Sequence, residues 1–345
     1  KAEVVISPCT IGGGREAAIC DEYFQTENVT ATLTVTPCWC YGTETMDLDP
    51  LTIKAVWGFN GTERPGAVYL AASMAAHAQR GLPVFAIYGK NVQDVGTSGI
   101  TEDVKEKILR FARCALVVGQ LKNKAYVSIG SVAMGIGGSF LDANRMQKYF
   151  GIRAEWVDMT EILRRIELNI YDKTEYEKEI AWIKKNCKEG EDFNDGAWGQ
   201  KAFTREELDR QWEFVAKMTL IVKDIMLGNV KLNELGRHEE ALGRNAIFGG
   251  FQGQRMWTDY KPNGDYTEAI LNTFDWNGKK QPLILATESD NCNGLTMLFE
   301  NLLTGRASIF ADVRTYWSKE AVERVTGWTA EGRAADGFIH LLNSG

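Results

Sequence analysis

The sequence lacks an uninterrupted apolar stretch of the length that a membrane-spanning helix needs. Such a helix takes about 20 predominantly apolar residues, and no run in the 345 residues comes near that length. An excess of positive charge is also missing, because 39 lysines and arginines stand against 46 aspartates and glutamates, a net charge of −7. Nucleic-acid binding depends on clustered basic residues. We therefore expect neither a membrane nor a nucleic acid as a partner.

Histidine is scarce, and the cysteines are not arranged in pairs. The three histidines, His77, His238 and His340, stand in no pattern typical of a zinc site or of nucleophilic catalysis. Of the seven cysteines only Cys38 and Cys40 lie close together, and a single Cys-x-Cys pair is a poor zinc signal. The odd number and irregular spacing favour reduced, mostly buried thiols in a cytoplasmic protein.

What the chain does have is the size and composition of a soluble protein with two or three domains. Hydrophobic residues make up 44% and charged residues 25% of the 345 residues, and a domain takes about 150 residues. Apolar strand-like runs alternate with amphipathic helical stretches, a pattern typical of α/β proteins with mainly parallel sheets. We expect strands at residues 4–7, 31–36, 83–88, 125–129, 153–157, 282–287 and 307–311.

Helices are expected between these strands. They cover residues 15–24, 66–79, 101–113, 135–149, 159–170, 205–227 and 294–303. Residues 116–120 fit either a strand or a continuation of the preceding helix. The polar residues 121–124 are the best candidate for a domain boundary, and the charged stretch 172–209 is expected to be helical and solvated, with no assigned role.

Three glycine-rich stretches raise the question of a phosphate-binding loop. They lie at residues 12–14, 135–138 and 249–253. None fits Gly-x-Gly-x-x-Gly with an acid about 20 residues on, and none carries the Gly-Lys-Ser/Thr of a P-loop. Tight turns between strands and helices are the better interpretation, which disfavours a nucleotide-dependent enzyme.

Aromatic and polar side chains alternate in three stretches that we expect to be loops. They lie at residues 38–41, 57–60 and 251–257. Tryptophan rings beside amides and an arginine suit a polyhydroxylated ligand. Simple filling of the core by these rings is an equally good interpretation.

Two carboxylates stand where a substrate site would be expected. Glu288 follows the apolar residues 282–287, and Asp312 follows the apolar residues 307–311, with a helix between the two runs. If the runs are parallel strands, both acids emerge at the carboxyl edge of the sheet, where open α/β sheets bind ligands. Their mutual repulsion would favour a cation between them, and oxygen ligands suit Mg²⁺ or Mn²⁺. Alternatively, each acid caps the helix that follows it; the pattern does not decide.

Longer stretches around these residues resemble the L-fucose isomerase family. The resemblance rests on TVTPCWCYG at residues 34–42, AVWGFNGTERPGA at 55–67, GFQGQR at 250–255 and FADVRTYWS at 310–318, and it runs essentially from end to end. It implies two successive Rossmann-like domains at 1–122 and 123–303, and the start of a C-terminal domain at 304–345. It also implies an intramolecular oxidoreductase that interconverts L-fucose and L-fuculose through a cis-enediol, accepts D-arabinose as well, uses Mn²⁺ and forms a hexamer.

Residue by residue, the resemblance implies that Glu288 and Asp312 bind the metal and exchange protons with the sugar. Trp39, Gln252 and Ser344 match positions that line the sugar site, with Trp39 serving a neighbouring subunit. Where the family pattern leads us to expect Glu-Asn-Asp, this chain has Ser289 between Glu288 and Asp290. Which of the two carboxylates removes the C2 proton stays open.

Both ends of the chain look cut. It opens inside a strand-like run without methionine and closes on an apolar run, so we expect a fragment. The family's substrate-binding arginine and third metal ligand, a histidine, are missing, so the chain alone is expected to hold metal weakly. The alternative function is a sugar-binding module without catalysis, which would bind sugar in the absence of metal.

Overall fold

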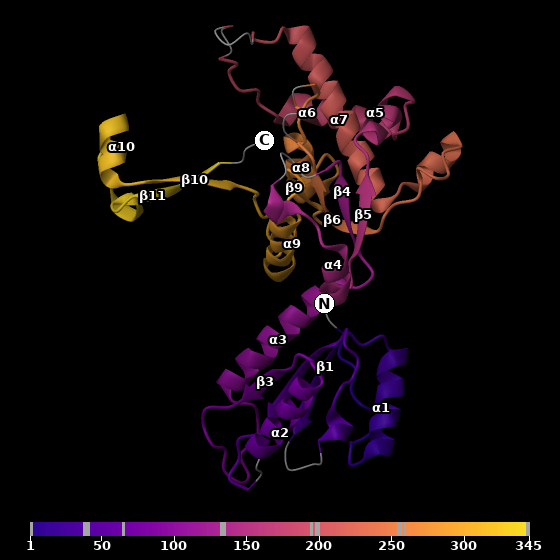
Figure 1. The fold of residues 1–345 in the computed structure, drawn as a ribbon, viewed down its shortest axis with the longest axis vertical. Coiled ribbons are helices and arrows are strands. Elements are labelled where there is room, and N and C mark those ends of the chain that lie inside the picture. Colours follow the sequence, from indigo (N-terminus) through magenta and orange to yellow (C-terminus); the bar gives the residue numbers. More distant parts are fainter. Residues whose placement is uncertain are drawn as a thin grey trace. The chain divides into compact units, whose positions relative to one another are not determined.

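The computed structural model describes residues 3–36, 42–63, 66–131, 136–193, 196, 201–253, 257–258 and 260–342. These residues form two compact units (Figure 1). The first contains residues 1–123 and 145–152, and the second contains residues 124–144 and 153–345. The expected α/β class with mainly parallel sheets is confirmed in both.

The first unit is built on a three-stranded parallel sheet with helices on both faces. The strands β1 (Ala31–Thr36), β2 (Ile53–Gly58) and β3 (Phe85–Tyr88) lie in the order β1-β2-β3. Successive residues of a strand point to opposite faces. Ala55 accordingly packs with Val104 of α3 (Glu102–Leu121), whereas Val56 packs with Tyr69 of α2 (Gly66–Gln79). This two-sided burial is the layered arrangement of Rossmann-like domains.

Two expectations for this unit are changed by the structure, and one open alternative is decided. Residues 4–7 are not a strand: Val4 is 82% and Ile6 is 79% exposed, and no described strand pairs with them. The aromatic stretch around Trp57, expected to be a loop, belongs to the central strand β2. Residues 116–120 continue helix α3. The unit also contains α1 (Gly14–Thr26), the 3₁₀ turn η1 (Thr43–Thr45) and most of α4 (Ala143–Phe150).

The second unit is built on a four-stranded parallel sheet in the order β5-β4-β6-β9. The strands are β4 (Ala125–Ile129), β5 (Arg153–Val157), β6 (Ala246–Phe251) and β9 (Ile284–Thr287). Strand β6 was not expected, because two glycines interrupt its apolar pattern. One face of the sheet packs on the long helix α7 (Arg205–Leu227), and α9 (Asn291–Thr304) packs on the other face against Phe248 and Ala286.

The remaining elements of this unit surround the sheet or follow it. The helices are α5 (Thr160–Glu167), α6 (Lys173–Asn186) and α8 (Asp265–Asn272), with 3₁₀ turns η3 (Gly137–Ser139), η4 (Val230–Leu235) and η5 (Gly332–Ala334). A small antiparallel pair joins β7 (Phe274–Asp275) to β8 (Gly278–Lys279). No helix among the described residues is long and apolar enough to cross a membrane.

The expected parallel strand at residues 307–311 is wrong. Residues 308–311 are in no strand; the next strand, β10 (Asp312–Trp317), pairs antiparallel with β11 (Phe338–Leu342), and α10 (Lys319–Thr326) lies between them in sequence. Only some of the apolar side chains in this run are buried: Phe310 is 7% exposed, but Ile309 is 73% exposed. Asp312 therefore begins a hairpin instead of ending a strand of the main sheet.

Candidate functional site

The carboxyl ends of three neighbouring parallel strands meet at one edge of the second sheet. Strand β4 leads into Gly130 and Ser131, β6 into Gln252, and β9 into Glu288. The Gln252 backbone N–H donates to the Ile129 carbonyl at 2.9 Å, and its side-chain Oε1 accepts from the Ser131 N–H at 3.0 Å. Gln252 is thus a buried link between the loops after β4 and β6, at the edge where α/β sheets bind ligands.

Glu288 stands in an unusual backbone turn directly after β9. Its φ is 60°, and that of Ser289 is 55°, a left-handed conformation that costs a residue other than glycine about 1–2 kcal/mol. Three hydrogen bonds hold the turn: the Ser289 N–H donates to the Phe251 carbonyl at 3.0 Å, the Asp290 N–H donates to Thr287 at 3.1 Å, and the Tyr126 hydroxyl donates to the Ser289 carbonyl at 3.3 Å. Two consecutive strained residues at a sheet edge favour a functional role for this turn.

Gly250 of strand β6 makes room for this turn. A Cβ placed on Gly250 would lie 2.5 Å from the Ser289 Cα and 2.6 Å from the Tyr126 hydroxyl oxygen. Only glycine lets the two backbones approach this closely. Gly249 and Gly250 are therefore part of a buried strand, with Gly250 packed against the Glu288 turn, and not of the tight strand-to-helix turn expected there.

The charge of Asp312 acts on Glu288, although the two residues do not lie on parallel strands. The Glu288 side chain is largely buried, and its pKa is raised first by that burial, then by the negative charges of Asp312 and Asp290. The Asp312 carboxylate lies 3.8 Å from an Arg314 guanidinium nitrogen and is partly exposed. Two converging carboxylates are the arrangement that a shared cation or proton stabilises.

The alternative prediction, that Glu288 and Asp312 cap the helices that follow them, is wrong. Helix α9 is capped by Asp290, whose side chain accepts from the N–H groups of Cys292 and Asn293 at 3.1 Å each. Helix α10 is capped by the Ser318 hydroxyl. Glu288 and Asp312 are therefore not used as helix caps.

A third acid, which the sequence did not single out, lies behind this edge. Glu268 of α8 is 6% exposed, and its Oε2 accepts a hydrogen bond of 2.5 Å from the hydroxyl of Thr287, the last residue of β9. Burial raises the pKa of Glu268 to about 8, against the lowering effect of the Thr287 hydrogen bond and with additional repulsion from Asp265 and Glu288. In the sequence, Glu268 looks like an ordinary polar residue of a surface helix.

The donor set at this edge suits a hard divalent cation. Glu288 and Asp312 offer carboxylate oxygens, the ligands that Mg²⁺ and Mn²⁺ prefer, and the repulsion that raises the pKa of Glu288 is what a cation would relieve. No group of three or more histidine, cysteine or acidic side chains that could hold a metal is found among the described residues. These two carboxylates alone are fewer than the six donors that such an ion takes.

Not every residue implied by the resemblance can be placed. Trp39 and Ser344 lie outside the described residues. The histidines are used elsewhere: His77 is buried in α2 with its Nδ1 2.7 Å from the Ser73 carbonyl, His238 pairs with Asn233, and His340 lies on β11 opposite Thr315.

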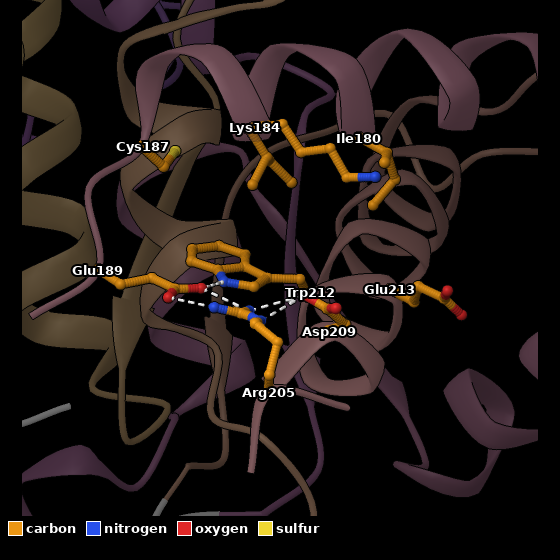
Figure 2. Close-up of a pocket in the computed structure, with 9 residues that line it drawn as sticks. Ile180, Lys184, Cys187, Glu189, Arg205, Asp209, Trp212 and Glu213 are labelled. Atoms are coloured by element: carbon orange, nitrogen blue, oxygen red, sulfur yellow. Dashed lines mark hydrogen bonds and ion pairs between the residues drawn. The ribbon is translucent and has the colours of Figure 1, made fainter. Parts of the chain in front are cut away.

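A separate hollow of about 400 Å³ lies between α6 and the start of α7. In Figure 2 the Glu189 carboxylate lies against both Trp212 and Arg205, while Asp209 accepts from the same arginine. Arg205 and the indole N–H are thus satisfied by neighbouring carboxylates. This hollow shares no residue with the sheet edge that carries Glu288, and we do not assign it to the site.

Two family models match this chain. The model of the first N-terminal domain of L-fucose isomerase matches residues 1–123, and the model of the second N-terminal domain matches residues 124–305. Glu288 therefore falls within the second match, whereas Asp312 follows it.

Known proteins match nearly the whole chain. It is similar to the L-fucose isomerase of Streptococcus pneumoniae serotype 2 (strain D39 / NCTC 7466), with 59% identity over 344 residues, 99% of this chain. The L-fucose isomerases of Bacteroides fragilis (strain YCH46) and of Phocaeicola vulgatus (strain ATCC 8482) are each 59% identical over 346 residues, again 99% of this chain. The chain spans 58% of the length of each of these relatives.

Proposed function

The chain belongs to the L-fucose isomerase family, and on this premise we propose that the whole protein is an aldose–ketose isomerase that interconverts L-fucose and L-fuculose. The single observation that carries the proposal is the buried Glu288 carboxylate in the strained turn after β9, at the carboxyl edge of the sheet, where the charge of Asp312 acts on it. The similarity to L-fucose isomerases across 99% of the chain supports the choice of sugar.

The two carboxylates supply the acid–base groups of this reaction. Isomerisation moves a proton from C2 of the aldose to C1 of the ketose through a cis-enediol. One of the pair, Glu288 or Asp312, removes the C2 proton, and the proton is returned at C1. A carboxylate with a raised pKa is suited to both steps, because it binds and releases a proton closer to neutral pH than a solvated glutamate does.

The proposed metal is Mn²⁺, with Mg²⁺ or another divalent cation as substitutes. Glu288 and Asp312 would hold it, and their hard oxygen donors fit such an ion. When bound, the ion supplies Lewis-acid chemistry that polarises the sugar carbonyl. Because two carboxylates are fewer than the donors it needs, we propose that further groups complete the site and that this chain alone holds metal weakly.

The remaining roles concern the sugar and the assembly. Gln252, whose Oε1 accepts from the Ser131 N–H, carries its side-chain amide at the same edge as Glu288. We place Trp39 and Ser344 along the sugar, with Trp39 serving a neighbouring subunit of a homo-oligomer, a hexamer by family resemblance. D-Arabinose and D-ribulose form a second substrate pair, and the protein acts in the cytoplasm.

A metal add-back experiment tests the proposal. The whole protein is stripped with EDTA, Mn²⁺ is restored, and conversion of L-fucose to ketose is followed by polarimetry, with sugar binding measured in parallel by calorimetry. We expect no ketose from the stripped protein and turnover after Mn²⁺ is restored. Saturable binding of L-fucose without metal, and no ketose under either condition, would instead identify a sugar-binding module.

A further inference from the structure

The hydroxyl of Thr287 joins the strand that carries Glu288 to the helix behind it. Thr287 is 1% exposed, and its Oγ1 donates to Glu268 Oε2 at 2.5 Å. It is the residue directly before the left-handed pair Glu288 and Ser289. Its side-chain bond therefore acts at the point where the regular strand gives way to the strained turn.

Helix α8, which carries Glu268, is itself held in place from two directions. The hydroxyls of Thr267 and Thr219 are 2.8 Å apart and both buried, which fixes α8 to α7. The Leu283 N–H donates to the Leu271 carbonyl at 2.9 Å, which ties the other end of α8 to the start of β9. Glu268 is thus a fixed anchor, because its helix cannot shift without breaking these contacts.

The other hydrogen bonds of the turn come from different strands. Phe251 at the end of β6 and Tyr126 on β4 both bind Ser289, the residue after Glu288. The residue after Glu288, Ser289, is therefore held by β4 and β6. The residue before it, Thr287, is held by Glu268. Removing the hydrogen bonds on either side of Glu288 frees a turn whose backbone conformation is intrinsically unfavourable.

A buried glutamate is a costly way to fix a helix to a strand. An acidic side chain in the interior needs hydrogen bonds to offset its desolvation, and an apolar contact would serve stability alone. Proteins accept this desolvation cost where a buried polar group orients a metal-binding side chain, because the hydrogen-bond partners of such a side chain set its geometry.

We propose that Glu268 is a positioning residue for Glu288, acting through the Thr287 hydroxyl to fix the direction of the Glu288 carboxylate. This inference rests on the proposed function, because it gives Glu268 a role only if Glu288 works as a ligand and acid–base group. Glu268 itself touches neither sugar nor metal.

Four single variants of the whole protein test the inference. Thr287→Val keeps the shape and removes the donor, Glu268→Leu removes the acceptor, and Glu268→Gln keeps an acceptor oxygen. Thr32→Val is the matched control, because it breaks a hydroxyl-to-carboxylate bond of 2.8 Å, from Thr32 of β1 to Asp47 Oδ2, that involves no residue of the site. For each variant, Mn²⁺ affinity is measured by electron paramagnetic resonance, kcat and KM are measured for L-fucose, and Tm is measured without metal.

We expect Thr287→Val and Glu268→Leu to lose about 10- to 100-fold in Mn²⁺ affinity and in kcat, the usual cost of removing a partner behind a ligand, with a smaller change in KM. Glu268→Gln should stay close to wild type, and a double variant that combines Thr287→Val with Glu268→Leu should lose no more than the worse single one. Thr32→Val should lower Tm and leave Mn²⁺ affinity and kcat unchanged.

The inference is overturned if Thr287→Val behaves like Thr32→Val, with a lower Tm but wild-type Mn²⁺ affinity and kcat. That result requires only a folded Thr287→Val protein, so a Glu268→Leu protein that fails to fold does not spoil the test. A wild-type protein that forms no ketose from L-fucose overturns the proposed function, and one that also takes up no Mn²⁺ overturns this inference with it.

Discussion

Placing an alanine at Gly250 is expected to distort the Glu288 turn from the neighbouring strand. The added Cβ would lie 2.5 Å from the Ser289 Cα and 2.6 Å from the Tyr126 hydroxyl oxygen. The Ser289 backbone cannot simply move away, because its N–H is bonded to the Phe251 carbonyl at 3.0 Å, one residue from the substitution. Strand β6 must then separate from β9, or the turn must change its conformation.

The magnitude follows from the kind of contact. Overpacking a tight interior costs about 1–3 kcal/mol, and the larger figure applies where the opposing atoms are backbone. In a domain of this size, each kcal/mol lowers Tm by about 2–4 °C. Because the displaced residue directly follows Glu288, we also expect weaker Mn²⁺ binding by the whole protein.

The matched control is Gly138→Ala. Its Cβ would meet no atom of the described residues within 4 Å, and its φ is not in the left-handed range, so its effect should stay within about 0.5 kcal/mol. Urea unfolding and Mn²⁺ titration of both variants give the comparison. If Gly250→Ala is as stable as Gly138→Ala and binds Mn²⁺ as wild type does, then the close packing of β6 on the Glu288 turn is not what fixes this edge.

Two further predictions concern stability away from the site. Burial raises the pKa of Glu179 to about 9 from 4.5, so the folded state keeps a proton that the unfolded state releases; this group's contribution to stability is full below pH 4.5 and falls by up to about 1.4 kcal/mol per pH unit until about pH 9. Glu179→Gln should remove that part of the pH dependence in urea unfolding, and an unchanged slope would contradict the assignment. Thr204 forms a capping box with Glu207 at the start of α7, so Thr204→Ala should cost about 1 kcal/mol in thermal unfolding without changing kcat; a variant of wild-type stability would show that the cap contributes nothing.

The sequence predicts most regular elements of this fold because their apolar patterns are undisturbed. Strand β4 and helices α2 and α7 have the expected bounds. Strand β6 was missed because Gly249 and Gly250, which allow close approach to β4 and the Glu288 turn, look like turn residues in one dimension. The error at residues 307–311 has the opposite cause, since an apolar run predicts a strand whether or not a neighbouring strand is there to pair with it.

The candidate site could be predicted only where the local sequence pattern marks its residues. Glu288 could be singled out because it directly follows an apolar run, at the edge where α/β sheets bind ligands, although the pattern left a helix cap as the alternative. Glu268 could not be singled out, because its burial depends on a contact with Thr287, 19 residues further along the chain, and on the packing of α8. Asp312 was expected near Glu288 by way of a parallel strand; in the structure it begins a hairpin, and its charge still acts on Glu288.

The turnover of Glu288→Gln tests the central claim most directly. L-Fuculose formation by the whole protein with Mn²⁺ is compared among wild type, Glu288→Gln, Asp312→Asn and the control Glu300→Gln, which changes an exposed acid on α9. We predict that Glu288→Gln and Asp312→Asn lose at least about 100-fold in kcat, since removing a general base alone costs 10²- to 10⁴-fold, while Glu300→Gln keeps wild-type turnover. Near-normal turnover by Glu288→Gln would contradict the assignment of the active site to this sheet edge.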